Sequence, residues 1–61
     1  MIDVYYDHKT FTFLGLREAA LMVASNESIS NVYAVEMEII RCILCGKVLN
    51  NKYKFKLKEA N

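Results

Sequence analysis

Lysine alternates with a large apolar residue through seven positions: Lys52-Tyr53-Lys54-Phe55-Lys56-Leu57-Lys58. Because a β-strand points successive side chains to opposite faces, a strand here has Tyr53, Phe55 and Leu57 on one side and four ammonium groups on the other. A helix would instead scatter the lysines around its circumference. The alternation predicts a strand over about residues 52–58, in a sheet with one face on a core and the other in water.

The length and the composition predict one small domain over residues 1–61 that is marginally stable by itself. A chain of 61 residues buries roughly 60% of the surface that its unfolded form exposes, and this sequence shows no disulfide framework to support it. The apolar fraction of 54% exceeds the usual value for soluble domains. We therefore expect a homodimer or a complex with another protein.

The net charge of +1 is unevenly distributed along the chain. Residues 1–46 carry three basic and six acidic side chains, a balance of −3, whereas residues 47–61 carry five lysines and one glutamate, a balance of +4. This asymmetry predicts one basic face that attracts the phosphates of DNA or an acidic protein. A strand face that is merely solvated and resists edge-to-edge aggregation is the alternative. The candidate nucleic-acid-binding residues are Lys47, Lys52, Lys54, Lys56, Lys58 and Arg41.

Two short apolar segments around a polar break predict a β-hairpin over residues 2–13. The segment Ile2–Tyr6 is rich in β-branched and aromatic residues, and Thr10–Phe13 alternates threonine with phenylalanine. The phenylalanines are expected to share the core face with apolar residues of the first strand. No Asn-Gly or Asp-Gly pair fixes the turn at Asp7-His8-Lys9, so the register stays open.

Two helices are expected between the hairpin and the last strand. Good helix formers follow Gly15, and Glu18 provides the acidic half of a capping box, which predicts a helix over about 16–24. A polar loop, Ser25–Asn31, separates it from a longer helix over about 32–45. The expected fold is α+β in the order β-β-α-α-β, with a three-stranded antiparallel sheet packed against the two helices.

The second predicted helix has more apolar surface than one core contact requires. The stripe expected to face the core consists of Val32, Val35, Ile39, Cys42 and Ile43. An arc that extends beyond this stripe fits a helix that contacts its own sheet and a second surface. Glu36 is expected either in the exposed first turns or in an ion pair across an interface. The candidate interface residues are Tyr33, Met37, Ile40 and Leu44.

The two cysteines, Cys42 and Cys45, form a lone Cys-x-x-Cys motif. A zinc site needs four ligands, or three and a water, and the chain has one histidine, His8. A redox pair needs its thiolate at a helix N-terminus, whereas this motif falls at a predicted C-terminus. We therefore expect Cys42 in the core, Cys45 partly exposed, His8 in an exposed turn, and no bound metal.

No catalytic or membrane-spanning feature is evident in the sequence. The carboxylates show no paired spacing and neither glycine belongs to a phosphate loop, so we expect no catalytic residue, no cofactor and no small-molecule substrate. The first residues are acidic and polar, unlike a signal peptide. The longest apolar run, Ile39–Leu49, is interrupted by charges and is too short for a bilayer. These features predict a non-enzymatic cytoplasmic protein with reduced thiols and no membrane partner.

Four segments together resemble the NUMOD-type modular DNA-binding motifs that accompany homing endonucleases. They are Lys9-Thr10-Phe11, Arg17-Glu18-Ala19-Ala20, Ile40–Lys47 and Tyr53-Lys54-Phe55, and the resemblance covers roughly residues 6–57. It implies a fold of strands and a helix pair, and it implies DNA binding. The second helix departs from the short basic helix of that family, because it is longer, strongly apolar and carries two glutamates.

Two functions follow from these observations. The first is a small DNA-binding module, of phage or mobile-element type, that contacts phosphates through the lysine face. The alternative is a protein-interaction module, or a phage-type inhibitor of a host protein, that self-associates or binds its partner through residues 32–45.

Overall fold

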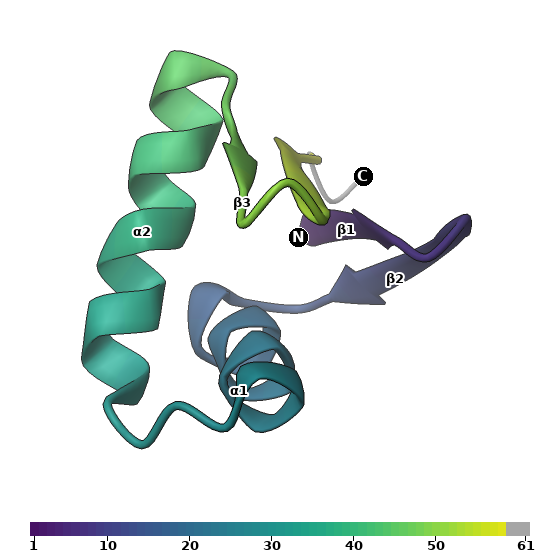
Figure 1. Cartoon of the computed structure of the whole chain (residues 1–61). Coiled ribbons are helices and arrows are strands. Elements are labelled where there is room, and N and C mark those ends of the chain that lie inside the picture. Colours follow the sequence, from purple (N-terminus) through teal and green to yellow (C-terminus); the bar gives the residue numbers. More distant parts are fainter. Residues whose placement is uncertain (59–61) are drawn as a thin grey trace.

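The fold is an antiparallel sheet of four strands with two helices packed on one of its faces (Figure 1). A computed structural model describes residues 1–58 of the chain. The elements are β1 (Ile2–Tyr6), β2 (Lys9–Phe13), α1 (Leu16–Glu27), α2 (Val32–Cys45), β3 (Val48–Leu49) and β4 (Tyr53–Leu57). The predicted α+β class, the N-terminal hairpin and the presence of two helices are confirmed.

The lysine-rich strand β4 lies inside the sheet, whose strand order is β2-β1-β4-β3. Val4 of β1 is the partner of Phe11 on β2 and of Phe55 on β4, so apolar side chains from three strands meet on the inner face. The Met1 amine donates to the Lys58 carbonyl oxygen at 3.0 Å, which extends the central pair of strands. Strand β3 covers only the start of β4, so Lys54 has a partner strand on both sides, whereas Lys56 has one on the β1 side alone. Protection of a sheet edge can therefore account for Lys56 but not for Lys54.

The sheet has one strand more than the three that the sequence predicts. The additional strand, β3, is only two residues long, and its Leu49 pairs with Tyr53 of β4. Two residues are too few for a recognisable alternation of side chains. The strand forms because Asn50 and Asn51 both adopt left-handed backbone angles, with φ of 51° and 56°, and return the chain onto β4. The predicted order β-β-α-α-β is therefore corrected to β-β-α-α-β-β.

The register of the first hairpin is set by a two-residue turn. Asp7 and His8 have φ of 54° and 60°, in the left-handed region that aspartate and histidine enter more readily than most residues. Two consecutive residues of this kind match the twist of the flanking strands, so Tyr6 pairs directly with Lys9. Both phenylalanines of β2 consequently pack on the same face as Val4, against the core.

The polarity of residues 25–27 predicts a loop, but helix α1 continues through them to Glu27 and corrects the predicted end near residue 24. Ser28 then adopts a left-handed conformation with φ of 56°, and the Ile29 N–H donates to the Ala24 carbonyl oxygen at 2.8 Å. The added turn is held by the side chain of Glu27, which bonds to the β3–β4 turn. A tertiary contact has overridden the local composition.

The core lies between the inner face of the sheet and the two helices. Ala19 and Ala20 of α1 are fully buried, and their small side chains allow neighbouring elements to approach closely. On α2, Val35, Ile39 and Cys42 are buried, as the apolar stripe predicts. The largest fully buried side chains are Tyr53, Ile39, Val4 and Val23. Within residues 1–58, neither helix is long and apolar enough to cross a bilayer.

Candidate nucleic-acid interface

The sheet has an open face on the side away from the helices, which we call the outer face (Figure 1). Because Val4, Tyr53 and Phe55 point inward to the core, the residues that alternate with them along each strand point outward. The side chains of the outer face are Thr10 and Thr12 of β2, Asp3 and Tyr5 of β1, Lys54 and Lys56 of β4, and Val48 of β3.

Tyr5 gives the outer face an aromatic side chain beside a lysine. Its partners in the two neighbouring strands are Lys54 and Thr10, and its side chain is partly exposed. Sequence reasoning missed this residue, because the alternation within β4 turns Tyr53 and Phe55 away from the lysines. The alternation of the first strand does carry the signal that Tyr5 and Val4 face opposite ways. The pairing of β1 with β4 is what brings Tyr5 next to a lysine.

Asp3 lies on the same face and reduces its positive charge. The Asp3 side chain is largely buried, and the Thr12 hydroxyl donates to its Oδ1 atom at 2.8 Å. In the sheet, Asp3 pairs with Lys56 on one side and with Thr12 on the other. The outer face is therefore mixed in charge, with its basic part on β4 and its hydroxyl groups on β2.

The structure brings together only part of the predicted basic set. Lys54 and Lys56 share the outer face, and Lys58 directly follows β4. Lys52 lies in the turn before the strand, which begins at Tyr53 rather than at residue 52, and its ammonium nitrogen lies 3.3 Å from Glu27 Oε2. The predicted row of four lysines on one strand is thus shortened at its start.

The other two predicted basic residues lie away from β4. Lys47 belongs to the connection between α2 and β3, where its N–H donates to the Cys42 carbonyl oxygen at 3.0 Å. Arg41 lies on the exposed side of α2, and its guanidinium is 3.7 Å from a carboxylate oxygen of Glu38. The expected contribution of Arg41 to the lysine face therefore has no support in the geometry.

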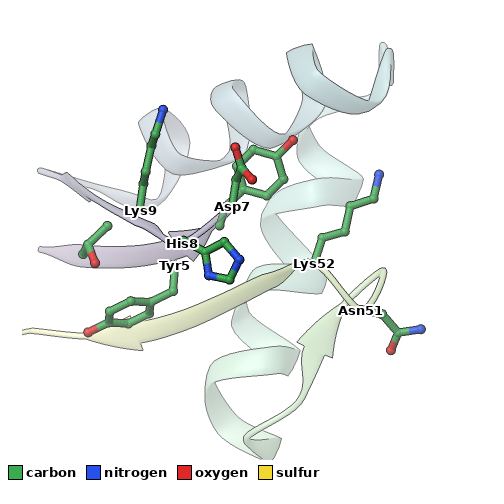
Figure 2. Close-up of a pocket in the computed structure, with 8 residues that line it drawn as sticks. Tyr5, Asp7, His8, Lys9, Asn51 and Lys52 are labelled. Atoms are coloured by element: carbon green, nitrogen blue, oxygen red, sulfur yellow. The ribbon is translucent and has the colours of Figure 1, made fainter.

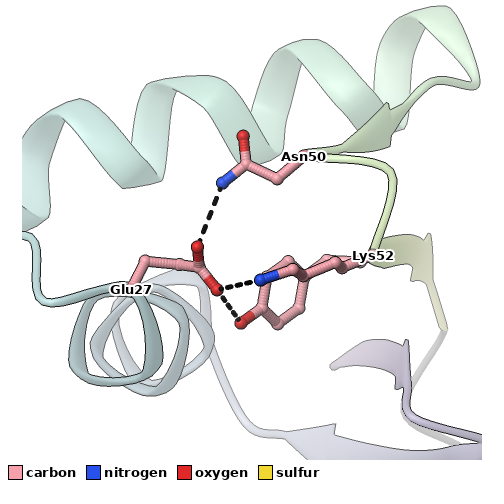
Figure 3. Close-up of polar contacts among 4 residues, drawn as sticks. Glu27, Asn50 and Lys52 are labelled. Atoms are coloured by element: carbon pink, nitrogen blue, oxygen red, sulfur yellow. Dashed lines mark hydrogen bonds and ion pairs between the residues drawn. The ribbon is translucent and has the colours of Figure 1, made fainter.

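Glu27 is the centre of a polar cluster that the sequence did not indicate (Figure 3). Its Oε2 atom accepts hydrogen bonds from the Tyr53 hydroxyl at 2.8 Å and from the Lys52 ammonium at 3.3 Å. Its Oε1 atom accepts a bond from the Asn50 side-chain amide at 3.4 Å. These three donors come from the β3–β4 turn and the start of β4, so the cluster fastens the end of α1 to the sheet.

The Glu27 cluster shifts the pKa values of both residues that share its shortest hydrogen bond. The bond from Tyr53, supported by Lys52 and Asn50, lowers the pKa of the Glu27 carboxyl, although partial burial acts in the opposite direction. Burial, followed by the bond to the Glu27 carboxylate, raises the pKa of Tyr53 to about 12. At neutral pH the cluster therefore contains an ionised Glu27 carboxylate and a neutral Tyr53 phenol, and its role is to stabilise the fold.

A shallow hollow of about 680 Å³ lies at the turn end of the sheet (Figure 2). Tyr5, His8 and Lys52 border it, and Figure 2 shows that they come from β1, the first turn and the second turn. His8 is exposed, as predicted for a turn residue. Because this hollow adjoins Tyr5, it continues the outer face toward the two turns.

The exposed side of α2 carries the predicted interface residues. Tyr33 and Leu44 are 66% and 80% exposed, Met37 is 47% exposed, and Ile40 is half-buried. An apolar groove of about 290 Å³ runs beside this surface. It is lined by Ile2, Leu16, Ile40, Ile43, Leu44 and Leu57.

Glu36 forms an ion pair within the chain. Its carboxylate lies 3.5 Å from the Arg17 guanidinium, and the Glu36 side chain is largely buried while that of Arg17 is exposed. One of the two expectations placed the basic partner of Glu36 across an interface. In the structure that partner is Arg17, which belongs to α1 of the same chain. The pair joins the two helices.

The cysteines lie where the sequence predicts. Cys42 is buried in the core and Cys45 is exposed, and both are free thiols. Burial raises the pKa of the Cys42 thiol, and the nearby Glu38 carboxylate adds to the shift. Among residues 1–58, no three side chains of the His, Cys, Asp or Glu types are grouped in a way that could hold a metal ion.

No protein-family model, curated protein or solved structure matches this chain. The resemblance to the NUMOD-type motifs therefore stays a prediction.

Acidification is expected to destabilise the domain partly through Glu27. Because the pKa of Glu27 is lower in the folded chain than in the unfolded chain, its contribution is present above its ordinary pKa and is lost as the pH falls through the lowered value. In urea unfolding between neutral pH and pH 3, Glu27→Gln should be less stable than the wild type at neutral pH, and the difference should shrink on acidification. Tyr53→Phe should lose about 1.5–3 kcal/mol at neutral pH, the usual effect of a hydrogen bond to a charged group. A difference between Glu27→Gln and wild type that stays constant with pH would contradict the cluster.

The two thiols are expected to differ in their reaction with an aromatic disulfide reagent. Cys45 should react rapidly in the folded protein, whereas Cys42 should react only as the core opens, because it is buried and its pKa is raised. Cys45→Ser should remove the fast phase and leave the slow one, and denaturant should merge the two phases. Two equally fast thiols in the wild type would show that Cys42 is accessible.

Proposed function

We propose that this domain binds single-stranded nucleic acid on the outer face of its sheet. The observation that carries the proposal is that Tyr5, a partly exposed aromatic residue, lies beside Lys54 on a face that neither helix of residues 1–58 covers. Aromatic side chains stack on bases of any sequence, and neighbouring lysines attract the phosphates. Tyr5 is the stacking residue of this proposal, and Lys54 and Lys56 are its phosphate contacts.

The shape of the basic surface favours a single strand over a duplex. A base can stack on Tyr5 only when it is unpaired on that side, as in single strands, loops and bulges. Recognition of a duplex through its major groove would require a protruding basic element. Helix α2 does not provide one, because its exposed side is mainly apolar and its one arginine lies 3.7 Å from Glu38.

The hollow at the turn end adjoins Tyr5 and offers room for a further nucleotide of a strand that is bound on the outer face. Along β4, Lys56 and Lys54 follow each other toward the turns, and Tyr5 lies beside Lys54. Beyond it lie the exposed His8 and the hollow that it borders (Figure 2). The Thr10 hydroxyl of β2 lies on the same face and can donate to a phosphate or sugar oxygen, whereas the Thr12 hydroxyl already donates to Asp3.

A second candidate function, a protein-interaction module, is favoured by the apolar surface of α2. Tyr33, Met37 and Leu44 expose apolar side chains together on one helix, and such a group of exposed apolar residues often marks an interface. This surface belongs to the helical layer, whereas the outer face lies on the other side of the sheet (Figure 1). The two functions therefore require different surfaces and are compatible in one molecule.

The proposal predicts measurable affinity for short labelled oligonucleotides in fluorescence anisotropy. Single-stranded DNA or RNA should bind more tightly than the duplex of the same sequence. Tyr5→Ala should weaken binding roughly 5- to 150-fold, because base stacking contributes about 1–3 kcal/mol. Tyr5→Phe retains the ring and should bind like the wild type.

The salt dependence of the same binding reaction tests whether Lys54 and Lys56 contact phosphates. The double variant Lys54→Gln, Lys56→Gln should reduce the slope of log affinity against log salt by about 1.4, because each single-strand phosphate contact contributes about 0.7. Lys47→Gln is the matched control, since Lys47 lies outside β4, and it should leave the slope nearly unchanged. Absence of binding at tens of micromolar protein in low salt would refute the proposal, as would an equal loss in Tyr5→Phe and Tyr5→Ala.

A further inference from the structure

Two residues of β1 on the outer face each have a lysine of β4 as their partner. Tyr5 pairs with Lys54, and Asp3, two positions earlier on the same strand, pairs with Lys56. Residues two apart on a strand point to the same face, with their Cα atoms about 6.5 Å apart. Strand β1 therefore presents an aromatic ring and a carboxylate in one row, and β4 presents two ammonium groups in the row beside it.

The Asp3 carboxylate is held in a fixed orientation by the sheet. Asp3 is 8% exposed, and the Thr12 hydroxyl donates to its Oδ1 atom at 2.8 Å. Among residues 1–58, no other side chain bonds to this carboxylate and no ion pair joins it to Lys56. No buried side-chain oxygen of these residues lacks a hydrogen-bond partner, so Oδ2 is open to the outer face. An oriented carboxylate with unused lone pairs is thus available to a ligand.

A carboxylate works against a surface that binds phosphates. It accepts hydrogen bonds and donates none, and its negative charge repels the phosphate backbone. Asp3 would therefore weaken the binding of a nucleic acid unless the ligand brings hydrogen-bond donors to it. The bases of a single strand bring such donors on their Watson–Crick edges, which are free when the strand is unpaired.

The bases differ in the donors that they present on this edge. Guanine has two adjacent donors, its ring N–H and its amino group, and these match the two oxygens of a carboxylate. Adenine and cytosine have one amino group beside an acceptor nitrogen, and uracil and thymine have one N–H between two carbonyl oxygens, which a carboxylate repels. Guanine is therefore the base that fits Asp3 best.

We propose that Asp3 recognises guanine in the single strand that the outer face binds. The guanine ring stacks on Tyr5, and its Watson–Crick edge reaches the carboxylate of Asp3 in the same row. Oδ2 and the remaining lone pair of Oδ1 accept the two donors of the base. Thr12 is a positioning residue, because it acts on the base only through the orientation of Asp3. The inference rests on the proposed function and adds to it the base that the site prefers.

Fluorescence anisotropy measures the preference with short labelled oligouridylates that differ at one central position. That position carries guanine, hypoxanthine, adenine or uracil. The wild type should bind the guanine strand roughly 5- to 150-fold more tightly than the uracil strand, the range expected for one bidentate contact to a base. The hypoxanthine strand should lie between them, because this base lacks the amino group and keeps the ring N–H.

Two variants and a matched control assign the preference to the carboxylate. Asp3→Asn keeps the side-chain size but offers one acceptor oxygen in place of two, so it should bind guanine and uracil strands nearly equally. Thr12→Val keeps the charge and releases the carboxylate, so the guanine preference should fall while the affinity for the uracil strand is unchanged. Asp7→Asn, the control, removes the same charge from the exposed turn after β1 and should keep the guanine preference. Circular dichroism checks that every variant is folded.

The outcomes separate this inference from the proposed function. Equal wild-type affinity for guanine and uracil strands, or a guanine preference that folded Asp3→Asn retains, overturns the role of Asp3 and leaves the binding function standing. A stronger preference for adenine than for guanine overturns the choice of base. If Asp3→Asn is unfolded, Thr12→Val decides, and a full guanine preference in that variant overturns the inference. Absence of binding to every strand overturns both proposals.

Discussion

The hydrogen bond between Tyr53 and Glu27 is the contact on which the rest of the structure depends. Tyr53 is the largest fully buried side chain, its ring stacks on Tyr6 with centroids 4.6 Å apart, and its hydroxyl cannot reach water. A buried phenol needs an acceptor, and Glu27 supplies one from the last turn of α1. The same carboxylate holds Asn50 and Lys52, so one group orders the end of a helix, a turn and a strand.

This cluster also determines which charges are available for binding. It engages Lys52 in the β3–β4 turn through Glu27 and leaves Lys54 and Lys56 as the lysines of the outer face. The domain thereby acquires two distinct surfaces. The outer face of the sheet combines an aromatic ring with lysines and hydroxyl groups, whereas the exposed side of α2 is apolar with flanking charges of both signs. A small domain without disulfides gains stability when a partner covers exposed apolar surface, so any partner of α2 would also stabilise the sheet that carries the outer face.

Much of the fold could be predicted because side-chain periodicity depends only on local chain geometry. The alternation around Phe55 predicted the inner face of β4, and the apolar stripe of α2 predicted the burial of Ile39 and Cys42. The strand count could not be predicted in this way, because β3 has two residues and forms only as the partner of β4. The end of α1 was misplaced for a similar reason, since residues 25–27 are polar and become helical through the contacts of Glu27.

By itself, the sequence determined both helices, three of the four strands, their inner faces and the apolar excess of α2, since each of these follows from residues a few positions apart. The tertiary structure decided which groups meet. It placed β1 beside β4 and so brought Tyr5 next to Lys54, and it joined Glu27 to Tyr53 across 26 residues of sequence. Contacts of this kind leave no periodic signal, because they exist only when the whole chain closes around its core. For that reason the binding surface differs from the lysine row that the sequence suggested, although the strand that carries it was predicted.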